Sequence, residues 1–167
     1  MSADAEQARG LRQPIQFYPM FENAIRHHRG ESIEAHQIRI SELWAGFSRV
    51  ASENPHAWIK TPVAAETIRT PGPTNRMISF PYPKLMNSNN AVDMGAALIM
   101  CSVAKARSLG IDESQWVYPW AGTDAHDTYH VSNRENLYSS PAIRIAGKRL
   151  LALTDLSVPD LDYIDVY

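Results

Sequence analysis

A run of amide and hydroxyl side chains, Asn87, Ser88, Asn89 and Asn90, stands directly before an apolar segment that Gly95 opens. Such side chains both donate and accept hydrogen bonds, so four in a row at the mouth of a buried element suit the binding of a polar small molecule. The same residues could instead form a tight turn, because Asn tolerates unusual backbone angles. Both interpretations stay open, and they do not exclude each other.

Two further side chains could do chemistry. Cys101, the one cysteine of the chain, lies in an apolar run with no histidine near it in sequence, surroundings that disfavour the reactive thiolate. We expect it to be structural and buried. His126, between Asp124 and Asp127, could be a polarised general base, although such a polar turn is more often solvated. No Cys and His spacing indicates a metal site, so we assign neither a catalytic residue nor a metal ligand.

The composition excludes several classes of partner. The chain has 167 residues and a net charge of −2, so it has no strongly basic surface for nucleic acid. Its longest apolar run, Ala96–Cys101, is too short to cross a bilayer, and the polar segment Met1–Gly10 does not resemble a secretory signal. One cysteine cannot form an internal disulfide. We therefore expect a cytoplasmic protein.

The first half of the chain is predicted to be helical and then rich in proline. Residues 1–16 are expected to be a flexible tail, followed by a helix that begins near Pro19 and stops at Gly30. Ser32 is predicted to cap a longer helix that ends at Asn54, with the apolar stripe Ile33, Ile40, Leu43, Trp44, Phe47 and Val50. Residues 54–83 contain six prolines, so we expect a functional loop or linker without a long regular element, and a turn at Thr70–Pro73.

The last third of the chain is predicted to alternate strands and helices. The strands are placed at Gly95–Cys101, Trp116–Trp120 and Asp162–Tyr167. The first helix is placed at Val103–Leu109, between a Ser102 cap and Gly110, and the second runs from Ser140 to Leu151 or Leu153, with Ile143, Ala146, Leu150 and Leu153 on its apolar face. This order predicts an α/β fold in which helices cover a sheet.

Three blocks of the sequence, in this order, resemble the thiolase superfamily. They are the Asn-rich block Asn87–Ala97, the helix start Ser140–Arg144, and the hydrophobic and acidic run Leu156–Tyr167. The closer resemblance is to thiolase-like acetyl-CoA acetyltransferases of the sterol-carrier-protein type found in actinobacteria, in which sequences like Tyr18–Asn23 and Gly122–Asp127 also occur. The resemblance covers nearly everything after Phe17.

This resemblance implies an α/β chain that forms part of a thiolase-like layered αβαβα fold, with an N-terminal helical loop-domain segment. Residues 17–84 would be that helical, proline-rich segment. Residues 85–112 would end the first core domain, and residues 113–167 would begin the second. The chain would then be an internal fragment of a longer protein.

The resemblance also implies an acyltransferase of lipid metabolism that acts on acyl-CoA thioesters, by 3-ketoacyl-CoA thiolysis or Claisen condensation. The Asn-rich run would contact coenzyme A, bound as a substrate and not as a covalent cofactor, and Asn90 matches a family serine that contacts the pantetheine arm. The family's nucleophilic cysteine and its catalytic His and Cys segments have no counterpart here. The chain would therefore supply scaffold and coenzyme A contacts, and would self-associate or pair with a companion thiolase-like chain. The alternative is a non-catalytic module that binds coenzyme A or docks on a protein.

Overall fold

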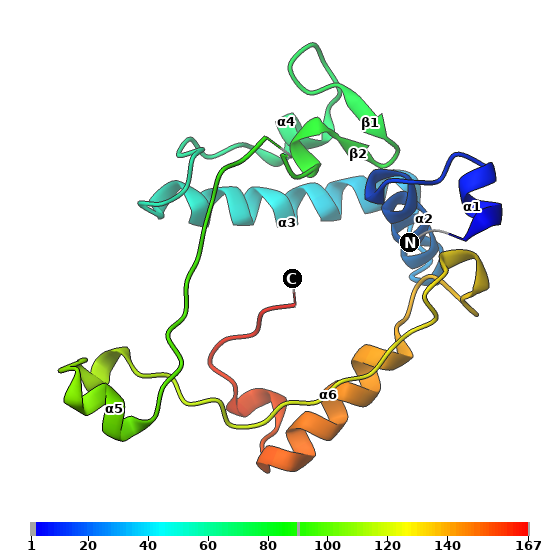
Figure 1. Cartoon of the computed structure of the whole chain (residues 1–167). Helices are drawn as coiled ribbons and strands as arrows, with labels where there is room; N and C mark the ends of the chain where they lie inside the picture. Colours follow the sequence, from blue (N-terminus) through cyan, green and yellow to red (C-terminus); the bar gives the residue numbers. More distant parts are fainter. Residues whose placement is uncertain (1–2, 90, 167) are drawn as a thin grey trace. The chain divides into compact units, whose positions relative to one another are not determined.

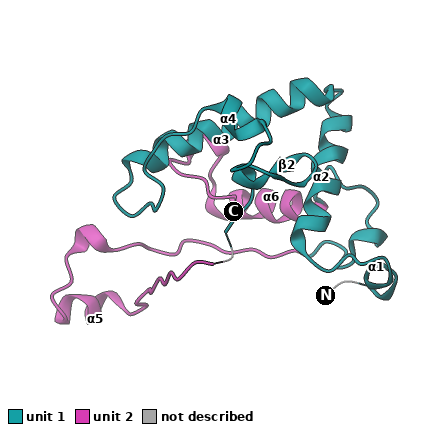
Figure 2. Ribbon diagram, turned by 90° about the horizontal axis from the view of Figure 1, so that it is seen from above, with its two compact units in different colours: residues 1–89, 126–140 teal, residues 90–125, 141–167 magenta. Residues whose placement is uncertain are grey.

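The structure is a computed structural model that describes residues 3–89 and 91–166. Its helices are α1 (Asp4–Ala8), α2 (Pro14–His28), α3 (Ile33–Glu53), α4 (Ala65–Arg69), α5 (Val103–Ser108) and α6 (Pro141–Thr154), and its strands are β1 (Met77–Ser79) and β2 (Tyr82–Pro83) (Figure 1). Short 3-10 helices are η1 (Lys84–Met86), η2 (Glu113–Gln115), η3 (Val131–Asn133) and η4 (Val158–Asp160). The chain divides into two compact units, residues 1–89 with 126–140 and residues 90–125 with 141–167 (Figure 2).

Helix α2 begins earlier than predicted and ends where predicted. Its first residue is Pro14, and Pro19 lies inside the helix, so the predicted start near Pro19 is wrong. The Gln16 side chain stabilises the earlier start, because its Oε1 atom accepts a hydrogen bond from the backbone of Gln13 at 2.9 Å. At the other end Gly30 has a φ of +69°, and its N–H donates to the carbonyl of His27 at 3.0 Å. A residue with a side chain would be strained in this left-handed conformation, which explains why glycine ends the helix.

Helix α3 confirms the predicted boundaries and corrects the predicted buried face. The Ser32 hydroxyl accepts a hydrogen bond from the Ala35 N–H at 3.1 Å, as expected for an N-terminal cap. The buried residues of α3 are His36, Ile40 and Ser41. Of the predicted apolar stripe only Ile40 is buried, since the other five members, Ile33, Leu43, Trp44, Phe47 and Val50, are exposed. The packed face of this helix is therefore more polar than its sequence periodicity indicates.

The proline-rich connector has no long regular element, as predicted, but it is a packed layer and not a loose linker. Helix α4 packs on α3, and β1 and β2 form an antiparallel hairpin in which Met77 pairs with Pro83. The turn predicted at Thr70–Pro73 forms two residues later, between Gly72 and Asn75, whose backbones exchange two hydrogen bonds of 3.1 Å. The core consists of Ile40, Ile68 and Met86, against which Ala45, Val63 and Tyr82 pack.

Residues 4–8 of the expected flexible tail form helix α1. Glu6 in this helix is buried, and its carboxylate accepts hydrogen bonds from the backbone of Ala3 at 2.7 Å and of Ser132 at 2.8 Å. The donation from Ser132, with a smaller contribution from Ala3, lowers the pKa of Glu6. A buried carboxylate with two backbone donors thus ties this end of the chain to residues 126–140 of the same unit.

The two predicted helices of the second unit form, whereas the three predicted strands do not. Ser102 caps α5 by accepting from the Lys105 N–H at 3.2 Å, and α6 begins at Pro141. Residues 95–101, 116–120 and 162–166 have no regular structure. A strand requires a hydrogen-bonded neighbour, and the only sheet found in residues 3–89 and 91–166 is the β1–β2 hairpin of the other unit. Tyr167 of the last predicted strand lies outside the described residues.

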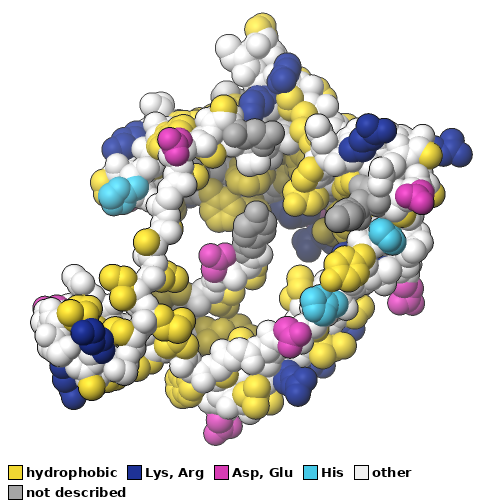
Figure 3. Space-filling model, viewed as in Figure 1, with side chains coloured by type: hydrophobic (Ala, Val, Ile, Leu, Met, Phe, Trp, Pro, Cys, Tyr) yellow, Lys and Arg dark blue, Asp and Glu magenta, His cyan; other side chains and the backbone are white. Residues whose placement is uncertain are grey.

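Hydrophobic side chains of the second unit are widely exposed. Leu98 is 99% exposed, and on α6 both Ile143 and Leu153 of the predicted apolar face point to solvent. Yellow side chains along α5, α6 and the segments beside them show this exposure (Figure 3). Within the part of the chain that the structure describes, every helix is too short or too polar to cross a bilayer.

Candidate functional site

The Asn-rich segment follows η1 at the end of the hairpin layer. Asn87 is half-buried, and its side-chain amide donates to the carbonyl of Pro83 at 2.8 Å, while its backbone N–H donates to Lys84 at 3.1 Å. Ser88 and Asn89 are exposed, and Asn90 lies outside the described residues. Asn87 thus stabilises the turn, as one of the two sequence interpretations expects, and the next two side chains are accessible to a ligand.

The elements before this segment hold it through one buried side chain and several backbone hydrogen bonds. Met86 is buried in the core beside Ile40 and Ile68. The preceding N–H groups are also paired, since Lys84 donates to the carbonyl of Arg76 and Leu85 to the side chain of Asn75, both at 2.9 Å. The segment therefore starts from a fixed point, because the residues immediately before it can leave neither the core nor the hairpin.

Asn75 connects this fixed point to helix α4, and our sequence analysis missed it. The side chain is 4% exposed, and its Nδ2 atom donates to the carbonyls of Thr67 and Ile68 at 3.0 Å and of Thr70 at 3.1 Å. Its Oδ1 atom accepts from the backbone of Leu85. The signal that could have found it is a single Asn two residues after Pro71-Gly-Pro73, because side-chain amides near turns often satisfy backbone groups.

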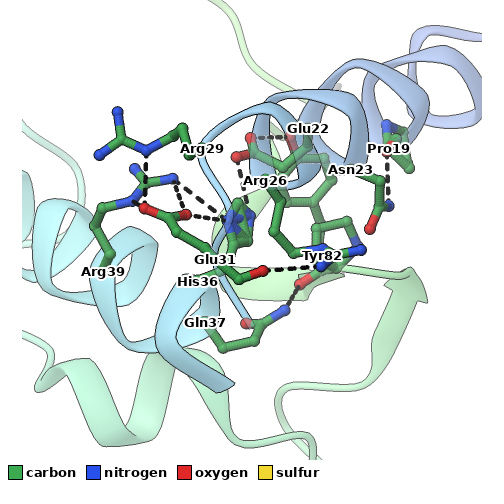
Figure 4. Close-up of polar contacts among 11 residues, drawn as sticks. Pro19, Glu22, Asn23, Arg26, Arg29, Glu31, His36, Gln37, Arg39 and Tyr82 are labelled. Atoms are coloured by element: carbon green, nitrogen blue, oxygen red, sulfur yellow. Dashed lines mark hydrogen bonds and ion pairs between the residues drawn. The ribbon is translucent and has the colours of Figure 1, made fainter. Parts of the chain in front are cut away.

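A second polar cluster surrounds His36 and joins α2, α3 and β2 (Figure 4). His36 Nε2 lies 3.1 Å from Glu22 Oε1, and His36 Nδ1 lies 3.3 Å from both Glu31 Oε2 and Arg39 Nη2. Arg39 also donates to both carboxylate oxygens of Glu31, at 2.8 and 3.0 Å. On the other side, the Tyr82 hydroxyl donates to Glu22 Oε2 at 2.6 Å. Five side chains thus form one continuous network.

The electrostatics of this cluster follow from burial and from the arginines. Hydrogen bonds from Arg39 and then Arg29 lower the pKa of Glu31 to about 2, so this carboxylate is ionised at neutral pH. Burial is the main cause that lowers the pKa of His36, and it outweighs the two nearby carboxylates. Burial, followed by the hydrogen bond to Glu22, raises the pKa of Tyr82. Because its pKa is lowered, the imidazole of His36 is neutral at pH 7.

The His36 cluster has the residue types of an acid–base site but not the access that catalysis requires. His36 is 1% exposed, and Gln37 next to it donates to the carbonyl of Pro81 at 2.9 Å, which closes the hairpin over the cluster. A general base must reach the proton that it transfers, directly or through one water. We interpret the network as structural. Sequence reasoning missed it because its members come from three separate elements.

Of the two other side chains considered for chemistry, Cys101 differs from expectation, whereas His126 is exposed, as expected for a solvated polar turn. Cys101 is exposed, so the expectation that it lies in a buried strand is wrong, for the same reason that the strand itself is absent. The carboxylate of Asp127 accepts from the Ser140 hydroxyl at 2.5 Å and contacts Arg134 at 3.4 Å, and the ring of His126 stacks on Tyr129. Among the residues described, no group of three or more His, Cys, Asp and Glu side chains is placed to hold a metal ion.

No family profile matches this chain, whereas comparison with individual proteins finds similar ones, among them the following two. An acetyl-CoA acetyltransferase of Methanocaldococcus jannaschii is 25% identical over 117 residues, which make up 70% of this chain and 28% of the relative. The crystal structure of a monomeric SCP2-thiolase-like protein type 1 from Mycobacterium smegmatis matches with a TM-score of 0.86 and 35% identity, over 99% of this chain and 36% of the other.

These comparisons bear on the family resemblance and on the fold class. The chain spans about a third of the length of the relatives that it matches. Over that length the sequence identity and the TM-score both indicate similarity to an SCP2-thiolase-like protein. The sheet predicted from the sequence nevertheless does not form within the described residues. The resemblance to the thiolase superfamily is therefore confirmed, and the chain has an α/β fold like that of SCP2-type thiolase-like proteins along nearly its whole length.

Proposed function

We propose that this chain supplies scaffold and coenzyme A contacts to a thiolase-like acyltransferase that acts on acyl-CoA thioesters, by 3-ketoacyl-CoA thiolysis or Claisen condensation. The observation that carries the proposal is the 35% identity to the M. smegmatis SCP2-thiolase-like protein over 99% of this chain, with a TM-score of 0.86. The name of the M. jannaschii relative, acetyl-CoA acetyltransferase, supplies the substrate class. Coenzyme A and acyl-CoA are substrates in this proposal, and no metal is required.

The proposed contacts are Asn87, Ser88, Asn89 and Asn90. Ser88 and Asn89 are exposed and have polar side chains, and Asn87 supports the turn that precedes them. The proposal assigns no catalytic group to this chain. A thiolase needs an activated cysteine and an oxyanion hole. Cys101, the sole cysteine, is exposed and lies in a segment without regular structure, directly before the Ser102 cap of the six-residue helix α5.

Isothermal titration of coenzyme A into the protein that carries this sequence tests the contacts. Replacing Ser88 or Asn89 with Ala should weaken binding about fivefold each, the effect of losing one hydrogen bond worth about 1 kcal/mol. Asn90→Ala should act in the same direction. Asn133→Ala, which removes an exposed asparagine in η3, is the matched control and should change nothing. Unchanged affinity in all three test variants would show that the coenzyme A contacts are assigned to the wrong residues.

A second candidate is a non-catalytic module that binds coenzyme A or docks on another protein. The exposed apolar side chains of α3, which include Leu43, Phe47 and Val50, favour it because they offer a surface that the described residues do not cover. Turnover of 3-ketoacyl-CoA by the protein that carries this sequence decides between the two. Binding without turnover supports the module, and turnover that survives Cys101→Ser supports the acyltransferase with its nucleophile elsewhere.

The setting and the domain boundaries belong to the same proposal. Residues 17–84, 85–112 and 113–167 are assigned to the loop-domain segment, the end of the first core domain and the start of the second. The protein works in the cytoplasm, in lipid metabolism, and it self-associates or pairs with a companion thiolase-like chain. Light scattering on the purified protein tests self-association, and a single species with the mass of one chain would contradict it. The M. smegmatis relative is described as monomeric.

A further inference from the structure

We infer that Asn75 is a positioning residue for the coenzyme A segment Asn87–Asn89. It would act through Leu85 and η1 and would not touch the ligand itself. The inference rests on the proposed function and adds to it the residue that holds the contacts in place. Three features of the described residues support it: the burial of Asn75, its pattern of hydrogen bonds, and its position between two otherwise separate backbone segments.

Asn75 uses both ends of its side-chain amide on backbone groups. Its Nδ2 atom lies within 3.1 Å of the carbonyl oxygens of Thr67, Ile68 and Thr70, which belong to the end of α4. Carbonyls at a helix C-terminus have no partner within the helix, so this amide satisfies groups that would otherwise be unpaired close to the core. Its Oδ1 atom accepts from the Leu85 N–H at 2.9 Å, so one planar group connects α4 to η1.

The connection reaches the Asn87–Asn89 segment within two residues. Leu85 is followed by Met86, whose buried side chain packs with Ile68, and then by Asn87, whose amide returns to the carbonyl of Pro83. Met86 fixes the depth of this stretch in the core, and the bond between Leu85 and Asn75 fixes the direction in which its backbone leaves the core. Loss of that bond frees the backbone from which Ser88 and Asn89 extend.

Neither Asp nor Ala can replace this amide. Asp keeps the acceptor for Leu85 but turns a carboxylate toward three carbonyl oxygens, and Ala removes donor and acceptor together. An ester in place of the Leu85 backbone amide is more selective, because it deletes one N–H and leaves every contact of Asn75 with α4 intact. Together, Asn75→Ala and the Leu85 ester separate the role of Asn75 in positioning the segment from its role in stabilising α4.

The experiment compares Asn75→Ala and the Leu85 ester with Ser48→Ala, in the protein that carries this sequence. Ser48 is the matched control because its hydroxyl accepts from the Val63 N–H at 2.9 Å, another anchor of the same connector that is distant in sequence from η1. Three quantities are measured for each variant: the midpoint of urea unfolding, the hydrogen exchange of the Met86–Asn89 amides, and the dissociation constant of coenzyme A.

We expect Asn75→Ala and the Leu85 ester to speed exchange at Ser88 and Asn89 at least tenfold and to weaken coenzyme A binding about fivefold or more. Ser48→Ala should leave both unchanged even where its unfolding midpoint falls. The ester variant decides the question if Asn75→Ala does not fold. If the affinity for coenzyme A falls in every variant, Ser48→Ala included, in proportion to the fall of the unfolding midpoint, then Asn75 is merely structural and the inference is overturned.

Failure of the inference and failure of the proposed function have different signatures. If Ser88→Ala and Asn89→Ala weaken coenzyme A binding while the Leu85 ester does not, only the positioning role of Asn75 is wrong. If Ser88→Ala, Asn89→Ala, Asn75→Ala and the Leu85 ester all leave the affinity unchanged, the segment does not bind coenzyme A and the proposed contacts are wrong as well.

Discussion

The connector of residues 54–89 and the segment of residues 91–125 are both poor in regular structure, yet only the connector is packed. In the connector, Ile68 and Met86 are buried with Asn75 between them. In the second segment, three consecutive apolar residues, Leu98, Ile99 and Met100, are exposed. An irregular segment can be buried only if its backbone N–H and C=O groups have hydrogen-bond partners. In the connector the side chain of Asn75 provides such partners, which a sheet would otherwise supply.

The same contrast distinguishes the polar groups of the two regions. The first unit places His36, Glu22 and Tyr82 from three elements in one buried network. Contacts within the second unit are mostly short in sequence, such as Arg107 with Trp116, although Thr123 donates to the carbonyl of Ala146 at 2.9 Å. The first unit therefore has the tertiary interactions that cooperative unfolding requires, and the predictions below test whether stability is concentrated there.

The largest expected difference comes from the same substitution made in both regions. Ile68 is 3% exposed and Ile99 is 83% exposed. Ile68→Ala should lower the free energy of unfolding by about 3 kcal/mol, because it removes buried methyl groups and leaves a cavity. Ile99→Ala should change it by less than about 0.5 kcal/mol. Urea unfolding followed by circular dichroism measures both, and a large cost for Ile99→Ala would show that its segment is covered in solution.

The next expected effect is a loss of stability in mild acid that depends on His36. Because the pKa of His36 is lowered in the folded protein, the contribution of His36 to the free energy of unfolding is complete above its unfolded pKa of about 6.5. It is lost as the pH falls below that value, with a slope of up to about 1.4 kcal/mol per pH unit for one proton. His36→Gln should flatten this part of the stability profile.

Glu31 should dominate the profile at lower pH. The pKa of Glu31, about 2, lies below the usual glutamate value of 4.5, so the contribution of Glu31 to the free energy of unfolding is present above pH 4.5 and is lost as the pH falls toward 2. Glu31→Gln should remove this second slope and leave the first. His56→Ala, at an exposed histidine, is the control for both variants, and an equal change in that control would assign the acid sensitivity to the surface.

The smallest expected effect concerns the two serine caps, which are chemically alike and lie in different regions. Ser32→Ala should lower the free energy of unfolding by about 1 kcal/mol, because it uncaps the long helix of the packed unit. Ser102→Ala should leave the unfolding midpoint unchanged and only increase hydrogen exchange in the first turn of α5. Equal shifts in the midpoint would show that α5 belongs to the same cooperative unit as α3.

Local rules predicted much of the secondary structure and little of the candidate site. Ser32, Ser102 and Pro141 mark helix starts where expected, because caps and first-turn prolines act on their own neighbours. The start of α2 was wrong because Gln16 satisfies donors that the pattern rules overlook. Asn75 and the His36 network were missed because their partners lie elsewhere in the sequence, where spacing carries no signal.

The sequence by itself determined the starts of α3, α5 and α6 and the resemblance to thiolases, since each depends on residues that are close together in the chain or on a recognisable order of blocks. Only the tertiary structure decided which apolar residues are buried and which polar groups meet. Periodicity shows that a helix or strand has an apolar face, but burial requires a second surface of matching shape. For Ile40 that surface comes from α4 and η1, and for Leu98 the described residues do not provide one.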